Sequence, residues 1–131
     1  MLTLAELEAE VVALARRIDA PADLLPTFGV SQDGARPHLE VDVRYHFVVV
    51  ERGVELERRS TQDLQVLLYW TFETVTFSMA TAWELRHRRE GEDFRVQLFG
   101  KQLALLAELE PAWSTRKRRE YVQVLKRHPL T

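Results

Sequence analysis

A single carboxylate, Glu73, interrupts the most apolar stretch of the chain, which runs from Asp63 to Glu90. Wound as a helix, this stretch has apolar side chains on every face, and a helix of that kind belongs inside a protein. An ionised carboxylate there is costly unless it is paired or hydrogen-bonded. We therefore expect Glu73 to have a partner, either a Tyr, Trp or Thr group or an arginine such as Arg44 or Arg95. The residues favour a structural pair over the alternative, a polar anchor that lines a groove.

Two histidines, His38 and His46, share one side of an alternating segment and invite a metal or acid–base interpretation. On one continuous strand they would lie about 26 Å apart, at about 3.3 Å per residue, whereas a turn between them would bring them closer. Exposed histidines on a strand are the favoured interpretation. Ser78 lacks the nucleophile elbow of a serine hydrolase. We therefore predict no catalytic residue, no metal site and no cofactor, and the protein is not expected to be an enzyme.

Basic side chains gather at residues 86–89 and 116–119. The chain as a whole has 18 basic and 20 acidic residues and a net charge of −2, which argues against a dedicated nucleic-acid binder. Clusters of this kind are usually solvated helix faces. A regulatory or nucleic-acid-associated module that uses the two clusters remains the alternative function, and an acidic protein partner would explain them equally well.

The length of 131 residues fits one compact domain, predicted to span residues 1–131. The chain contains no cysteine, which suits a reducing compartment. The N-terminal residues lack the basic region of a signal peptide, and no apolar run approaches the roughly 20 residues that span a bilayer. We expect a cytoplasmic protein without a membrane partner.

The spacing of apolar residues predicts an α+β fold that begins with a helix and continues with a small antiparallel sheet of three to four strands. Thr3 and Glu6 have the spacing of a capping box, and a helical pattern follows up to Pro21. Phe28 and Val30 read as a short strand that enters a hairpin at the Asp33-Gly34 turn.

Strict alternation marks residues 38–49, with one face expected to be buried and the other wet. The buried face would carry Leu39, Val41, Val43, Tyr45, Phe47 and Val49. One long strand or two strands joined by a turn at residues 42–44 would both fit, and strand length favours two. A turn at residues 51–53 and a last strand from Val54 complete the sheet.

Three helices are predicted after the sheet. The first is the long buried central helix, which Gly91 should end. Asp93 caps the second helix, and Pro111 stops that helix and begins the last one, which ends before Pro129.

An ordered series of short motifs runs through this part of the chain. The motifs are Tyr45-His46-Phe47-Val48-Val49-Val50-Glu51-Arg52-Gly53, Asp63-Leu64, Leu67-Leu68-Tyr69-Trp70, Phe72-Glu73, Val75-Thr76-Phe77-Ser78-Met79-Ala80, Glu84-Leu85, Asp93-Phe94-Arg95, Leu98-Phe99 and Lys101-Gln102-Leu103, then Trp113 and His128-Pro129. In order and spacing the series resembles the immunity protein 63 family of bacterial polymorphic toxin systems, over roughly residues 26 to 129. The family pattern has a longer turn, often with glycine, where this chain has only Asp42-Val43-Arg44, so the strand register there stays open.

The resemblance implies a non-enzymatic immunity protein that binds and neutralises a cognate toxin domain by stoichiometric occupancy. Its toxin-binding residues are expected among exposed polar positions near the sheet and the central helix: Glu51, Arg52, Glu55, Glu73 and Glu84. The identity of the toxin, the oligomeric state and the choice between a structural and a functional Glu73 stay open.

Overall fold

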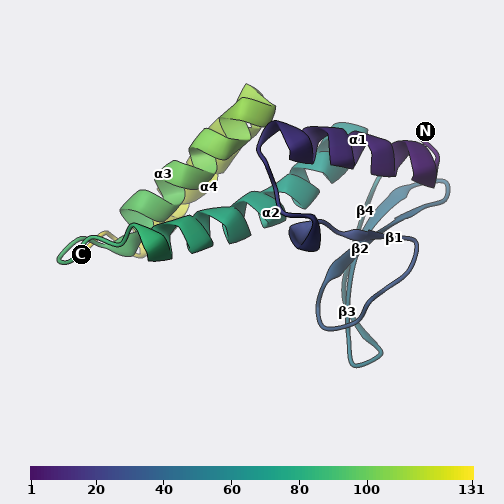
Figure 1. The fold of residues 1–131 in the computed structure, drawn as a ribbon, viewed down its shortest axis with the longest axis horizontal. Coiled ribbons are helices and arrows are strands. Elements are labelled where there is room, and N and C mark those ends of the chain that lie inside the picture. Colours follow the sequence, from purple (N-terminus) through teal and green to yellow (C-terminus); the bar gives the residue numbers. More distant parts are fainter. The chain divides into compact units, whose positions relative to one another are not determined.

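The computed structural model describes all 131 residues and shows the α+β fold: an N-terminal helix, a four-stranded sheet and three further helices (Figure 1). The chain forms two compact units, residues 1–72 and 73–131, and the boundary falls inside the long helix α2 (Leu64–Arg86). No helix combines the length and the apolar character needed to cross a membrane.

The first unit begins with α1 (Leu4–Arg17), which the capping box starts as predicted. Thr3 Oγ1 accepts a hydrogen bond from the Glu6 amide (3.1 Å), and Glu6 Oε1 accepts one from the Thr3 amide (2.9 Å). Leu7, Val11 and Ala15 are buried along one stripe of this helix. A short 3-10 turn, Ala22–Leu24, then leads into the sheet.

The sheet has the order β1 (Thr27–Phe28), β2 (Pro37–Val41), β3 (Tyr45–Glu51) and β4 (Val54–Thr61). β2, β3 and β4 pair in antiparallel fashion, but β1 runs parallel to β2, so the predicted hairpin at Asp33-Gly34 is wrong. The loop after β1 instead brings the chain back to the start of β1 before β2 begins. In this loop the Ala35 amide donates a hydrogen bond to the Val50 carbonyl at 3.0 Å. β1 is so short that this small loop suffices, whereas longer parallel strands need a crossover of a dozen or more residues.

The alternating segment forms two strands, with the turn at Asp42–Arg44 that was favoured over one long strand. Asp42 Oδ1 accepts the Arg44 amide hydrogen at 2.8 Å, which fixes the turn. Leu39 then pairs with Phe47, and Glu40 with His46. Val43 was predicted on the buried face but lies in the turn and is 79% exposed.

Both faces of β3 are covered over its first four residues, so the expected wet face is wrong there. Tyr45 and Phe47 are buried on one face, and His46 and Val48 are buried on the other. The Tyr45 hydroxyl accepts the Leu2 amide hydrogen at 2.8 Å, so the segment that leads into α1 lies against the Tyr45 face. On the other face, polar side chains cover one another.

The second unit contains the later part of α2 together with α3 (Phe94–Leu109) and α4 (Pro111–Arg127). α2 ends at Arg86, earlier than predicted, and Gly91 lies in the following loop with a φ of 79°. Asp93 caps α3, and Pro111 stands at the start of α4, both as predicted. α3 and α4 run side by side (Figure 1). Their buried residues are Leu98, Gln102, Leu105, Leu106 and Leu109 from α3 and Trp113 and Tyr121 from α4.

Candidate functional site

Residues 51–56, which we call the hairpin tip, form the end of the β3–β4 hairpin. Arg52 and Gly53 both have positive φ, 52° and 73°, as a two-residue type I′ turn requires. The Gly53 amide donates to Asp33 Oδ1 at 3.2 Å, so the loop before β2 holds the tip. The turn conformation and the contact with the loop before β2 therefore both hold the backbone of the tip in place.

Two apolar side chains of the hairpin tip face solvent: Val54 is 59% exposed and Leu56 is 58% exposed. Val49 pairs with Glu57 and Val50 with Glu55, so β4 skips Leu56 in a β-bulge. A bulge of this kind bends an edge strand and changes the direction of its side chains. Glu51, Arg52, Val54 and Leu56 line one shallow depression.

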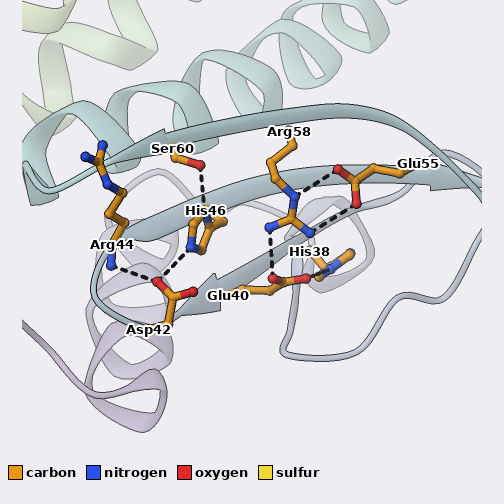
Figure 2. A network of polar contacts seen from close by, with 8 residues as sticks. All are labelled: His38, Glu40, Asp42, Arg44, His46, Glu55, Arg58 and Ser60. Carbon is orange, nitrogen blue, oxygen red and sulfur yellow. Dashed lines mark hydrogen bonds and ion pairs between the residues drawn. The ribbon is translucent and has the colours of Figure 1, made fainter.

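A cluster of charged side chains extends from Glu55 of the tip across the sheet face that carries His46 (Figure 2). Arg58 donates to both carboxylate oxygens of Glu55, at 2.8 and 3.1 Å, and to Glu40 at 3.1 Å. Glu40 also contacts His38 Nε2 at 2.7 Å. We call these four residues the Arg58 cluster.

The hydrogen bonds of the Arg58 cluster keep its carboxylates ionised. The Arg58 guanidinium holds the pKa of Glu55 below its usual value, and Arg58 and then His38 do the same for Glu40. Glu55, followed by Glu40, raises the pKa of Arg58 in return. Glu55 is thus a fixed anion beside the exposed Leu56.

A second set of contacts, the Ser60 chain, links Asp42, His46 and Ser60 on the same face (Figure 2). His46 Nδ1 lies 2.6 Å from Ser60 Oγ, and His46 Nε2 lies 2.8 Å from Asp42 Oδ1. The Arg44 amide, followed by His46, holds the pKa of Asp42 below its usual value. Asp42 and Ser60 are exposed, whereas the ring of His46 is buried between them.

Both histidines were predicted to be exposed, and both are buried. The turn at residues 42–44 folds their strands together, and the two side chains enter different contacts, His38 in the Arg58 cluster and His46 in the Ser60 chain. His38 Nδ1 is buried without a hydrogen-bond partner. No group of three or more His, Cys, Asp or Glu side chains is placed to hold a metal ion.

A match to a known protein family shows which family this chain belongs to. Residues 41–123 match the family model described as immunity protein 63. The chain belongs to the immunity protein 63 family. No curated protein and no solved structure matches it. Membership indicates an immunity function, and the family is generally non-enzymatic.

The matched range of this immunity protein 63 chain includes the whole hairpin tip and the Ser60 chain. Of the residues predicted to bind toxin, Glu51, Arg52 and Glu55 lie together at the tip. Glu73 and Glu84 lie in the other compact unit, each with a partner of its own. Sequence reasoning missed Val54 and Leu56 as surface residues because alternation cannot reveal a bulge.

Glu73 has a basic partner, as expected, but the partner is Lys117 at 2.9 Å and not Arg44 or Arg95. Arg95 instead pairs with Asp93. The Glu73 side chain is 29% exposed, so it lies at the border of the helix packing and not deep inside it. Its backbone carbonyl accepts a hydrogen bond from Gln102 Nε2 at 2.9 Å.

Glu84 was expected to be an exposed member of the binding surface, but its side chain is only 2% exposed. Arg88, one turn later on the chain, donates to both of its oxygens at 2.8 and 3.1 Å. The Arg88 guanidinium holds the pKa of Glu84 below its usual value. The buried charge is therefore satisfied inside its own unit.

These pairs also occupy much of the two basic clusters. In the first cluster, Arg88 pairs with Glu84, and Arg89 lies 3.6 Å from Glu92. In the second, Lys117 pairs with Glu73, and Arg116 lies 3.6 Å from Glu120. Four of the seven Lys and Arg side chains in the two clusters thus have a carboxylate partner, which lowers the charge available for phosphates.

Proposed function

We propose that this immunity protein binds the toxin domain of a bacterial polymorphic toxin system and neutralises it by stoichiometric occupancy. The family match over residues 41–123 carries this proposal. Inhibition by occupancy requires a complementary surface but no reacting group, and it covers the toxin's active site or blocks a motion that the toxin needs.

The hairpin tip is the surface that we assign to the toxin. Protein interfaces combine apolar or arginine anchors at the centre with a polar rim. Val54 and Leu56 would supply the apolar contacts, and Glu51, Arg52 and Glu55 the charged rim. Charges of both signs would set the encounter rate and the choice of partner.

The tip is also pre-organised for binding. The type I′ turn, the bond from Gly53 to Asp33 and the Arg58 cluster hold its backbone and Glu55 in place before a partner arrives. A surface that is already ordered loses less conformational entropy on association. This favours the tip over freely moving charged side chains elsewhere.

Glu73 and Glu84 fall outside the surface that we propose. A toxin group that took either carboxylate would have to replace Lys117 or Arg88, and breaking a sheltered ion pair offsets much of the gain. Their roles are then structural.

Co-expression with the C-terminal domain of the toxin encoded next to this gene tests the function. We expect the cells to survive and the two proteins to co-purify in a fixed ratio. A toxin domain from an unrelated system serves as the control and should not be neutralised. Absence of rescue, or rescue without a complex, would overturn inhibition by occupancy.

A further inference from the structure

The Ser60 chain joins a hydroxyl, an imidazole and a carboxylate in series (Figure 2). Ser60 and His46 are opposite each other in the β3–β4 register, and Asp42 belongs to the turn that precedes β3. The two hydrogen bonds measure 2.6 and 2.8 Å. These are the contacts that an activated serine makes with its base, and that the base makes with an orienting group.

The carboxylate of Asp42 determines which nitrogen of neutral His46 carries the proton. An ionised carboxylate only accepts hydrogen bonds, so Nε2, which faces Asp42, must be the donor. Nδ1 then has its lone pair directed at Ser60, and the serine hydroxyl donates to it. Asp42 Oδ1 is held in place because it also accepts the Arg44 amide hydrogen at 2.8 Å.

We propose that Ser60 is a nucleophile activated by His46 and that it reacts with small activated acyl esters. Ser60 is exposed on the outer strand of the sheet, so a small ester can reach its hydroxyl. His46 is buried, and its ring is held between two fixed partners. Asp42 is a positioning residue that also stabilises the imidazolium formed during the reaction.

The reaction is a transfer of one acyl group to the protein. Ser60 Oγ forms a bond to the ester carbonyl carbon while its proton passes to His46 Nδ1. The bond from that carbon to the leaving oxygen then breaks, and the imidazolium returns the proton to the departing alkoxide. The products are acyl-Ser60 and an alcohol, so no oxidant or metal is required.

The reaction needs the neutral imidazole of His46, so its rate depends on pH. Asp42 contacts its ring directly, and Glu40 lies opposite it in the β2–β3 register. Glu40 is itself engaged by Arg58 and His38. Acid protonates the imidazole and removes the lone pair that Ser60 needs, so the rate of acylation should fall as the pH is lowered.

Acetylation by p-nitrophenyl acetate tests the proposal, with release of nitrophenol and the mass of the Ser60 peptide as readouts. We expect one acetyl group at Ser60, none there in Ser60→Ala, and an unchanged rate in Ser31→Ala, whose serine contacts no histidine. His46→Gln should slow acetylation by about a hundredfold or more, the usual contribution of a general base. It should also abolish the pH dependence.

Asp42→Asn separates charge from geometry, because its amide oxygen can still accept both hydrogen bonds. The rate should fall although the turn remains. If His46→Gln fails to fold, Asp42→Asn and the wild-type pH profile still decide. Acetyl groups only on lysines, or a rate at Ser60 in the folded His46→Gln or Asp42→Asn variant equal to that of the wild type, would overturn the proposal. Rescue from the toxin should persist in Ser60→Ala, so this outcome is independent of the immunity function.

Discussion

Lys117 Nζ lies 2.9 Å from Glu73 Oε1, and this ion pair ties α4 to α2 within residues 73–131. The same ammonium group lies 3.2 Å from Glu120 Oε2. The Lys117 side chain is 12% exposed, whereas that of Glu73 is 29% exposed. The lone carboxylate of the apolar helix is therefore neutralised by a more deeply buried cation with two acidic partners.

Glu73→Gln should lower the free energy of unfolding by about 1 kcal/mol or less, because Lys117 keeps Glu120 and the pair is partly hydrated. Urea denaturation measures the change, and the exposed Glu90→Gln serves as the control with no expected effect. The variant should still protect cells from the toxin. Loss of protection with unchanged stability would show that Glu73 contacts the toxin.

Gln102 is a second polar link in the same unit, and it is fully buried. Its Nε2 donates to the Glu73 carbonyl, and its Oε1 accepts the hydroxyl hydrogen of Tyr121. Gln102→Leu should cost about 2–3 kcal/mol, because buried polar groups lose their partner. Tyr121→Phe should cost about 1 kcal/mol. The double variant should cost less than the sum of the two, and strict additivity would contradict the direct bond.

Alkaline stability should depend on Tyr121. Burial raises the pKa of its hydroxyl, and the charges of Glu73 and Glu120 add to this effect. The folded state therefore binds this proton more tightly than the unfolded chain, whose tyrosine titrates near pH 10. Stability is retained below that value and falls as the pH rises above it. Tyr121→Phe should flatten this fall in urea denaturation between about pH 9 and 11, and an unchanged slope would exclude Tyr121 as its source.

Acid should weaken the sheet through Glu40. Arg58, followed by His38, lowers the pKa of Glu40 in the folded state, so the unfolded chain takes up the proton first as the pH falls. The stabilisation is present above the ordinary carboxylate pKa of about 4 and is lost below it. In Glu40→Gln the free energy of unfolding should depend less steeply on pH between about 5 and 3. Glu8→Gln, on the exposed side of α1, should leave the slope unchanged.

The features that the sequence predicted correctly depend on neighbours along the chain. Thr3 and Glu6 form their capping box, Asp93 caps α3, and Pro111 begins α4. Each of these signals acts within a few residues, where spacing fixes geometry. The family motifs added the relationship that no single motif could establish, and the family match covers residues 41–123.

The features that were predicted wrongly depend on partners distant in the chain. The cation that pairs with Glu73 comes from α4, and the hydroxyl group that contacts His46 comes from β4. The parallel pairing of β1 depends on how a loop folds. Glu84 was taken for a surface residue because its helix position does not reveal how deeply it is packed. Period and propensity carry no information on such contacts.

The hairpin tip gives the sharpest test of where the toxin binds. Leu56→Asp places a charge on a side chain that is 58% exposed, so the free energy of unfolding should change by no more than about 0.5 kcal/mol. If Leu56 is an apolar anchor, its loss should weaken the complex at least about tenfold, or about 1.4 kcal/mol. Arg52→Glu should mainly slow association and alter its salt dependence, because it changes the charge of the rim.

Val43→Asp is the matched control for Leu56→Asp. Val43 is an exposed apolar residue of the same sheet, but it lies in the turn at the opposite end of β3. The same charge introduced there should leave affinity unchanged, as measured by surface plasmon resonance with the toxin domain. If Val43→Asp weakens binding and Leu56→Asp does not, the toxin binds at the other end of the sheet. If neither does, the docking surface lies away from both turns, and the hairpin tip is excluded.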